Sequence, residues 1–252
     1  MCRTISIFNM KGGVGKTTTA YNLAAGLADF CHQKVLLVDI DPQGNSSASF
    51  GIPIWDLELQ IRDVLLRKAS IQDTVISIRD NIDVVPSNII LAEDEIPISG
   101  LPGRELLLRK AIASIEDKYD YILIDCPPNI GVFSINALMA SQEVLIPVDL
   151  SFLGLLGLRS IEKALDLIRT ALDHPLKITG VLATRYDGRT NVSKEVLQSL
   201  KDTFSDKMFS TVIPENVKIK EAPSFSIPVY QHDEKGVGAK AYSSLVQEVI
   251  CR

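Results

Sequence analysis

The sequence predicts an α/β fold: a mostly parallel, twisted sheet with helices on both faces. Short apolar runs rich in β-branched residues alternate with longer segments that carry apolar residues at helical spacing, and this alternation implies right-handed crossovers between parallel strands. The runs expected as strands are 4–8, 34–38, 82–85, 121–124, 143–148 and 178–184. The segments expected as helices are 17–28, 103–116, 133–140, 155–172, 192–204 and 238–250.

Composition favours one large globular domain over residues 1–252, with 46% apolar and 23% charged residues. The first strand starts almost at residue 1, which leaves no room for a signal peptide, and no apolar run is as long as a membrane span. We therefore expect a cytoplasmic protein. The four cysteines lack zinc-ligand spacing and are expected as reduced thiols, and the three histidines are expected in solvated positions.

Two parts of the chain are less regular or less obvious. Segment 45–99 mixes prolines and Gly51 with short amphipathic pieces, which indicates irregular insertions at a sheet edge. The final helix is amphipathic, but its polar face, with Lys240, Ser243, Gln247 and Glu248, lacks the basic cluster that attracts anionic lipid. We therefore expect the apolar face of this helix to pack against the protein core and not against a membrane surface.

A glycine-rich loop joins the first strand to the first helix and has the features of a phosphate cradle. Glycines let successive backbone N–H groups turn toward one anion, Lys16 adds a cation for the β- and γ-phosphates, and the Thr17 hydroxyl suits Mg²⁺. The helix that opens at Lys16 also directs its positive end toward the anion. The loop reads Lys11-Gly12-Gly13-Val14-Gly15-Lys16-Thr17-Thr18.

The loop departs from the general P-loop form at its start. Met10 stands where the first glycine is usual, and Lys11 follows it. A second lysine so close to Lys16 needs an anion of its own. We expect that anion to be the protein's own nucleotide or one held by a second subunit.

Carboxylates follow two other strands. Asp39 and Asp41 occupy alternate positions at the end of the second strand, and Asp125 directly follows the fourth apolar run, 121–124. Ligands of open α/β sheets bind at the carboxyl ends of the strands, so Asp39 and Asp41 are expected near a γ-phosphate and its water. Asp125 fits the Walker-B pattern, in which a carboxylate holds Mg²⁺ through water beside Thr17.

Taken together, these motifs resemble the ParA/Soj family of deviant Walker-A, MinD-like partitioning ATPases, and the likeness covers nearly the whole chain. The first strand leads directly into the P-loop, so the chain resembles the short form without an N-terminal helix-turn-helix domain. The further matching stretches are Asp39-Ile40-Asp41-Pro42-Gln43-Gly44-Asn45, Asp125-Cys126-Pro127-Pro128, Tyr186-Asp187-Gly188-Arg189-Thr190-Asn191 and Ile213-Pro214-Glu215-Asn216-Val217-Lys218.

The resemblance implies an ATP- and Mg²⁺-dependent homodimer that hydrolyses ATP slowly. Lys11 would reach the partner subunit's ATP, while Lys16 and Thr17 serve their own nucleotide. Asp41 would orient the attacking water and contact Mg²⁺, with Asp39 as its support. The residues expected to hold adenine are Thr184, Pro214 and Asn216.

The resemblance also implies DNA binding without sequence preference, association with the nucleoid, and a ParB-like centromere-binding partner that stimulates hydrolysis. The candidate DNA-binding residues are Arg185, Arg189, Lys194, Lys218 and Lys220. Residues 185–240 hold nine Lys or Arg against eight Asp or Glu, in a chain of net charge −5. Glu215 stands where the family commonly has Arg, and Ser151 where an acidic residue is common. Both departures bear on DNA binding, because a carboxylate at position 215 would repel phosphate.

Three alternatives remain open at this point. A MinD-type membrane regulator would need a basic amphipathic terminal helix, for which Lys240 and Arg252 are too few. An iron–sulfur ATPase would need two cysteines from each subunit near the nucleotide, where only Cys126 is expected. A ParA-like positioner of another cargo would share the same ATP and DNA chemistry.

Overall fold

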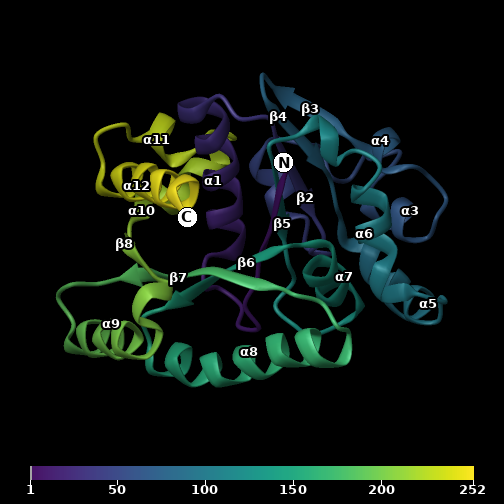
Figure 1. The fold of residues 1–252 in the computed structure, drawn as a ribbon. Helices are drawn as coiled ribbons and strands as arrows, with labels where there is room; N and C mark the ends of the chain where they lie inside the picture. The colour runs from purple at the N-terminus through teal and green to yellow at the C-terminus, as the bar shows by residue number, and fades with distance from the viewer. Residues whose placement is uncertain (1) are drawn as a thin grey trace.

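A computed structural model describes residues 2–252, and in helix α8 it describes side chains only at 154, 161, 163–166 and 168–171. Its eight strands form one sheet in the order β3-β4-β2-β5-β1-β6-β7-β8. Every neighbouring pair is parallel except β3 with β4. The predicted α/β fold is therefore confirmed (Figure 1). The strands are β1 (Arg3–Ile7), β2 (Val35–Asp39), β3 (Ile76–Arg79), β4 (Ile82–Val85), β5 (Tyr121–Asp125), β6 (Glu143–Asp149), β7 (Lys177–Tyr186) and β8 (Met208–Pro214).

Helices cover both faces of this sheet, because successive strand residues point to opposite sides. In β2, Val35 and Leu37 pack on one face, while Leu36 and Val38 pack on the other. The helices of the first face are α1 (Lys16–Cys31), α2 (Asn45–Ser49), α10 (Val217–Glu221), α11 (Val229–His232) and α12 (Val237–Cys251). Those of the second face include α3 (Ile61–Leu65), α4 (Ile71–Thr74), α5 (Glu95–Ser99), α6 (Leu107–Ile112), α7 (Val132–Ala140), α8 (Phe152–Ala171) and α9 (Asn191–Phe204).

The sequence patterns missed the two edge strands, β3 and β8. An edge strand is covered less completely, so it lacks the continuous apolar run by which the central strands were predicted. β3 is only half-buried along its length, and from Phe209 onward β8 alternates buried residues with exposed or half-buried ones. Segment 45–99 contributes the β3–β4 pair at one edge of the sheet, together with α2 to α5.

The helix expected over 103–116 is shorter than predicted. A 3-10 turn at Arg104–Leu106 precedes α6, which ends at Ile112. The buried Asn136 side chain of α7 accepts a hydrogen bond from the Leu108 N–H (3.0 Å) and donates to the Arg104 carbonyl (2.7 Å). These bonds satisfy backbone groups at the start of α6, so the helix begins there.

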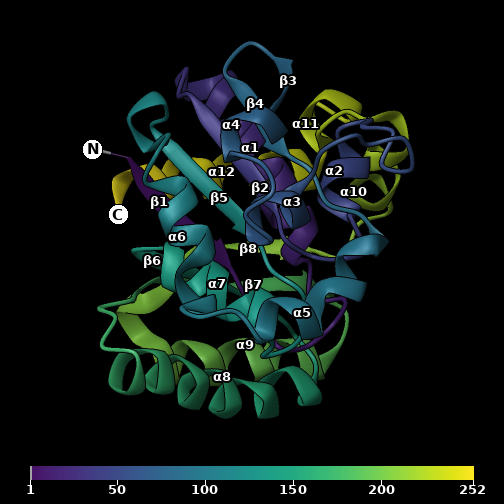
Figure 2. The same cartoon turned by 90° about the vertical axis from the view of Figure 1, so that its right-hand side faces the viewer.

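The C-terminal helix docks on the core, as predicted. The apolar face of α12 is buried against α1 and β8 through Tyr242, Leu245, Val246 and Val249. Its Glu248 carboxylate accepts hydrogen bonds from the Ser210 and Thr211 N–H groups of the edge strand (2.8 and 2.7 Å). Figure 2 shows the two chain ends on the same side of the molecule. Over the described residues, the search for a helix with the length and apolarity of a membrane span finds none.

Candidate nucleotide-binding site

The candidate site lies at the carboxyl ends of three neighbouring strands, β2, β5 and β1. Register pairs Asp39 on β2 with Asp125 on β5, and Asp125 with Ile7 on β1. The glycine-rich loop follows β1 directly, so the sheet brings the loop and both carboxylates to one edge. This is the edge at which open α/β sheets bind ligands.

The glycine-rich loop has the backbone of a phosphate cradle. Gly13 and Gly15 have φ angles of 74° and 88°, the left-handed region that glycine adopts without a Cβ penalty. Gly15 is the N-cap of α1, so the free N–H groups of a 16-residue helix point at the loop. The geometry suits an anion.

Lys16 lies beneath the loop and is 6% exposed. Its ammonium donates to the Lys11 carbonyl at 3.1 Å. Burial lowers the pKa of Lys16, while the nearby carboxylates Asp125 and Asp41 oppose this effect. The hydrogen-bond partner of this buried cation is a neutral carbonyl, so a bound phosphate would stabilise its charge strongly.

Asp125 is fully buried and only partly satisfied. Its Oδ2 accepts a hydrogen bond from Ser46 Oγ at 2.7 Å, whereas its Oδ1 has no partner among the described residues. Burial raises the pKa of Asp125, and the Ser46 hydrogen bond and the nearby Thr17 hydroxyl counter part of that shift. An orphaned carboxylate oxygen beside a threonine hydroxyl fits the oxygen donor set that Mg²⁺ prefers.

Asp39 lies at this edge of the sheet, and neighbouring groups of the chain bind both of its carboxylate oxygens. Its Oδ1 accepts from the Asp41 N–H (3.2 Å), and its Oδ2 accepts from Ser47 N (2.9 Å) and Oγ (2.8 Å). Burial, with the charge of Asp125 second, raises the pKa of Asp39. The side chain shapes the loop that carries Asp41, and only Asp41 of these two residues lines the adjoining cavity.

Two cavities meet at the glycine-rich loop. One, of about 290 Å³, is lined by the P-loop, Asp41, Gln43, Asn45 and Pro128. The other, of about 150 Å³, shares Gly13, Gly15 and Thr18 with the first. Its remaining walls are Thr184, Arg185, Ile213, Pro214, Glu215, Asn216, Ile219, Lys220 and Tyr242. The pair has the layout of a phosphate site joined to a nucleoside site.

The three residues expected around adenine all line the smaller cavity. Thr184 also donates its hydroxyl hydrogen bond to the Val14 carbonyl at 2.8 Å, which ties β7 to the P-loop. The Asn216 side chain caps α10 by accepting from the Lys218 N–H at 2.7 Å. Asn216 is therefore oriented by its own helix, and Pro214 ends β8 beside it.

Lys11 pairs with an anion within its own chain. Its ammonium contacts both carboxylate oxygens of Asp149, at 2.9 and 2.8 Å, and Ser151 Oγ at 3.0 Å. Asp149 ends β6, the strand next to β1. The acidic residue expected near position 151 is therefore present two positions earlier.

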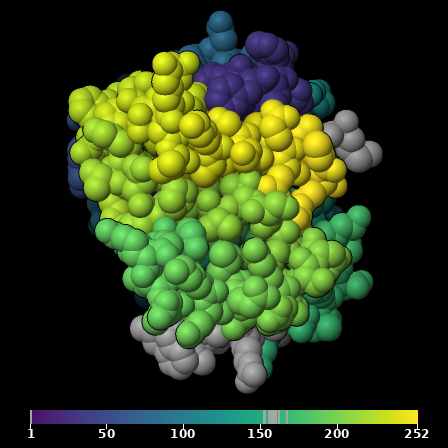
Figure 3. Space-filling model, turned by 90° about the vertical axis from the view of Figure 1, so that its left-hand side faces the viewer, coloured from purple at the N-terminus to yellow at the C-terminus, as the bar shows by residue number. Residues whose placement is uncertain are grey.

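Most of the candidate DNA-binding cations are paired with carboxylates. Arg185 and Lys220 both contact Glu215, Arg189 contacts Asp187, and Lys218 contacts Glu221. Lys194 is exposed on α9 and forms no ion pair within the described part of the chain. The C-terminal part of the chain, which carries these residues, covers one face of the molecule (Figure 3).

Arg185 and Lys220 also line the nucleoside cavity, so the structure joins part of the proposed DNA set to the nucleotide site. Arg185 has a φ of 55° and donates to the Gly13 carbonyl at 3.2 Å. Glu215 lies between these two cations, and their contacts lower its pKa. The residue that departs from the family pattern is thus part of an ionic cluster at the cavity rim.

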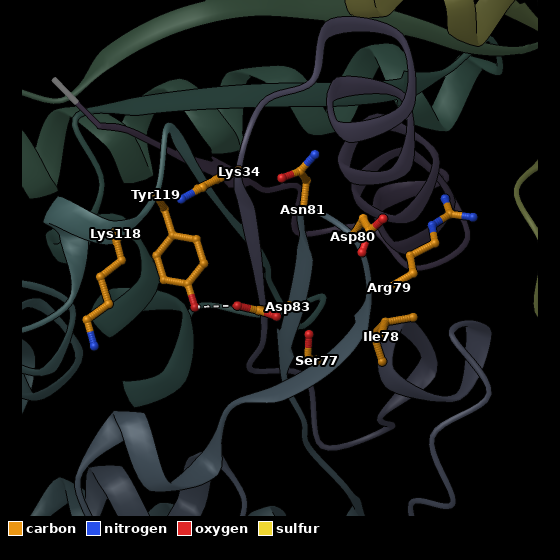
Figure 4. Close-up of a pocket in the computed structure, with 9 residues that line it drawn as sticks. All are labelled: Lys34, Ser77, Ile78, Arg79, Asp80, Asn81, Asp83, Lys118 and Tyr119. Carbon is orange, nitrogen blue, oxygen red and sulfur yellow. Dashed lines mark hydrogen bonds between the residues drawn. The ribbon is translucent and has the colours of Figure 1, made fainter.

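A separate cavity of about 640 Å³ lies at the other end of the strands, around Lys34, Asp83 and Tyr119. Figure 4 shows its side chains spread around the rim, with Tyr119 donating to Asp83 (2.8 Å). The titratable groups do not converge on one point, unlike those beside the P-loop. This cavity lacks the arrangement of a catalytic site.

Sequence reasoning missed three residues of the site: Ser46, Ser47 and Asp149. The available signal for Asp149 was its place directly after the strand predicted over 143–148, at the carboxyl end where ligands of such sheets bind. No sequence signal distinguishes Ser46 and Ser47 from other loop serines. His174 was also misjudged, because it is buried and its Nε2 lies 2.7 Å from the Ser141 carbonyl oxygen.

Comparison with known sequences agrees with this layout. An AAA-domain family model matches residues 2–178. The sporulation initiation inhibitor protein Soj of Bacillus subtilis is 43% identical over 250 residues, covering 99% of this chain and 98% of Soj. The chromosome partitioning protein ParA of Caulobacter vibrioides is 40% identical over 253 residues, covering 99% and 94% of the two chains.

A solved structure extends the comparison to bound ligands. Cobyrinic acid a,c-diamide synthase from Mycobacterium smegmatis, with a bound ATP analogue and magnesium, superposes with a TM-score of 0.87. The two proteins are 31% identical, and the match covers 98% of this chain and 93% of the synthase.

Proposed function

This chain belongs to the ParA/Soj family of chromosome-partitioning ATPases, and we propose that it is an ATP-switched homodimer that binds DNA without sequence preference. In this proposal a ParB-like centromere-binding protein stimulates hydrolysis, and the cycle positions plasmid or chromosomal DNA on the nucleoid. The observation that carries the proposal is the pair of adjoining cavities, one at the P-loop and one at the Thr184 and Asn216 wall, which share Gly13, Gly15 and Thr18 as lining residues.

ATP and Mg²⁺ fit the residues of this cavity. The P-loop N–H groups and Lys16 would hold the β- and γ-phosphates, and Thr17 with Asp125 would hold the metal. The Oδ1 of Asp125 supports this assignment, because it has no hydrogen-bond partner among the described residues. Bound Mg²⁺ would neutralise charge that develops on the phosphates. Thr184, Pro214 and Asn216 would enclose the base.

In this proposal Asp41 would orient the attacking water. It lines the phosphate cavity, and its Oδ1 accepts the Gln43 N–H at 3.0 Å. Asp39 supports it by accepting the Asp41 N–H and by fixing Ser47. Since Asp39 is occupied by these bonds, its role is to position the loop. A single orienting carboxylate is consistent with slow hydrolysis that a partner accelerates.

The dimer switch follows from the position of Lys11. In one subunit alone, the Asp149 carboxylate neutralises the Lys11 ammonium. A second subunit that presents a γ-phosphate would offer a stronger anion, and Lys11 would exchange Asp149 for it. ADP lacks that phosphate, so ADP would leave the pair with Asp149 intact. ATP, and not ADP, would therefore drive dimerisation.

DNA binding would depend on the dimer because each subunit offers few unpaired cations. The candidate cations of one subunit are largely neutralised by their carboxylate partners. Two subunits would double the number of phosphate contacts, and binding would weaken steeply with salt. Glu215 reduces the affinity for DNA, because its carboxylate neutralises Arg185 and Lys220 in ion pairs.

The alternatives fit the observations less well. A membrane regulator of the MinD type would bury the apolar face of its terminal helix in lipid, whereas that face of α12 is packed against the core. An iron–sulfur protein would need an accessible thiolate, but Cys126 is fully buried and burial raises its pKa strongly. A positioner of another cargo would use the same ATP and DNA chemistry and stays open.

A gel-shift experiment with unrelated DNA duplexes tests the proposal. We expect a shift with ATP and Mg²⁺, none with ADP, and none for Lys11→Ala. The double variant Lys194→Glu/Lys218→Glu should lose the shift and keep ATP-driven dimerisation, since these two exposed candidates line neither of the two cavities. Its matched control, Lys68→Glu/Lys110→Glu, changes two other exposed lysines by the same charge. An ATP dimer of the wild type that fails to shift DNA at low salt would contradict the DNA role.

A further inference from the structure

One side chain, Arg185, joins two walls of the nucleoside cavity. Its Nη1 donates to the Gly13 carbonyl at 3.2 Å, and its Nε donates to Glu215 Oε2 at 3.0 Å. All three residues line the cavity. Gly13 belongs to the P-loop, whereas Glu215 directly follows β8. Arg185 therefore links the P-loop to the wall that carries Pro214 and Asn216.

The backbone of β7 directs Arg185 toward the P-loop. β7 and β8 pair side by side, and between two paired positions β7 has Thr184 and Arg185 where β8 has only Ile213. Arg185 lies in this bulge with a φ of 55°, a left-handed conformation that residues other than glycine seldom adopt. Bulges turn a side chain out of the regular strand pattern, and they are common beside functional sites. The link to Gly13 thus depends on an irregularity of this strand.

Glu215 is the other end of the link and is itself held in place. Its backbone N–H donates to the Tyr186 carbonyl at 3.0 Å, and its Oε1 contacts the Lys220 ammonium. The contacts with Lys220 and Arg185 lower the pKa of Glu215, which keeps the carboxyl ionised. The side chains of Arg185 and Glu215 are 50% and 33% exposed. A pair that is so accessible to water can open at modest cost.

The cavity closed by this link is small for a nucleoside. Its volume is about 150 Å³, whereas cavities that hold small molecules usually measure about 300 to 1,000 Å³. The phosphates of a nucleotide would occupy the adjoining P-loop cavity, but the base and the ribose would have to enter this one. The two walls must separate for that entry, and the link through Arg185 resists their separation.

We infer that Arg185 and Glu215 form a latch over the nucleoside cavity, and that this latch has to open before a nucleotide enters or leaves. The latch therefore sets the rates of nucleotide binding and release, and it has little effect on the affinity. The inference rests on the proposed function in one respect, namely that the cavity takes a nucleotide. Slow opening would prolong the ADP-bound state after hydrolysis.

The charge of Glu215 provides a test in which two explanations predict opposite signs. Glu215→Gln removes a negative charge beside an anionic ligand, so electrostatic attraction alone would make release of the nucleotide slower. Loss of the latch makes release faster. We expect Glu215→Gln to release ADP about fivefold faster, which is the change expected when one partly exposed ion pair is lost.

Rapid filtration of radiolabelled ADP measures this rate with an unmodified ligand, whereas a fluorophore on the base or ribose would itself hold the cavity open. Protein loaded with labelled ADP and Mg²⁺ is mixed with excess unlabelled ADP, and the label retained is followed over time. The Kd from calorimetry should change much less than the release rate, because entry becomes faster as well. Unchanged or slower release from Glu215→Gln would overturn the latch. So would a Kd that weakens by the same factor, since that shows a contact made only in the bound state.

A second variant shows whether the two residues act as a pair. Arg185→Gln should also release ADP faster, and the double variant should release it no faster than the faster single variant, because both changes open the same link. Asp187→Asn is the matched control. It removes the charge from the neighbouring ion pair with Arg189, and neither residue is among the described residues that line the cavity. If the two single effects multiply in the double variant, or if Asp187→Asn speeds release as much as Glu215→Gln, the latch is wrong.

Salt dependence gives an independent check on the same samples. Salt screens an exposed ion pair, so release of ADP from the wild type should become faster as salt rises, and the dependence should be weaker for Glu215→Gln. Equal salt dependence of the two proteins would contradict the latch. A chain that retains neither ADP nor ATP would refute the proposed function together with the latch. Retention of ADP with the same release rate in Glu215→Gln would refute the latch alone.

Discussion

The pair between Lys11 and Asp149 leads to the most specific prediction: Asp149→Asn should tighten the ATP-dependent dimer. The Lys11 ammonium lies within 2.9 Å of both carboxylate oxygens, and the two side chains are 33% and 13% exposed. A partly exposed pair of this kind contributes about 1 kcal/mol. Asparagine keeps the shape of the side chain and removes the charge that competes with a phosphate for Lys11.

The magnitude follows from the symmetry of the dimer. Each subunit must give up its Lys11–Asp149 pair, so the dimer loses about 2 kcal/mol, which corresponds to about thirtyfold in the dimer Kd. This is an upper limit, because the asparagine oxygen still accepts a hydrogen bond from Lys11. We therefore expect Asp149→Asn to dimerise more tightly, by up to about thirtyfold, with a non-hydrolysable ATP analogue and to stay monomeric with ADP.

Light scattering over a range of protein concentrations would measure this change. Asp166→Asn is the matched control, since it makes the same substitution in an exposed ion pair with Arg169. Adding Lys11→Ala to Asp149→Asn should abolish the gain. If Asp149→Asn dimerises no more tightly than the wild type, or dimerises with ADP, then Asp149 does not compete with the γ-phosphate of a second subunit for Lys11.

Four other predictions follow from the site. Lys16→Ala should lose nucleotide binding, measured by calorimetry, because Lys16 is the buried cation beneath the cradle. Asp41→Ala should keep ATP binding and slow single-turnover hydrolysis by about 10²-fold or more; hydrolysis at the wild-type rate would shift the role to another residue. Glu215→Arg should strengthen DNA binding in gel shifts, since it frees Arg185 and Lys220 from their shared carboxylate. Burial raises the folded-state pKa of Asp39, so the nucleotide-free protein should lose stability as the pH rises above about 4; urea denaturation of Asp39→Asn should show a smaller loss.

Some features of this protein were determined by the sequence itself. The P-loop is local in the chain, since its glycines, Lys16 and Thr17 are neighbours and their backbone requirements are short-range. The central strands were predictable because strands buried on both faces need continuous apolar runs. Asp41 and Asp125 were predictable as well, because each lies at or just beyond the carboxyl end of such a run.

Other features were decided only by the tertiary structure. Whether Lys11 is free depends on Asp149, which lies 138 positions away and reaches Lys11 only because β6 pairs with β1. Asp41 lines the phosphate cavity and Asp39 does not, and Ser47 and the Asp41 N–H bind the oxygens of Asp39. Glu215 joins Arg185 because β8 lies beside β7. Ion pairs and buried hydrogen bonds form between groups that the sheet order brings together, and no local pattern in one sequence encodes that order.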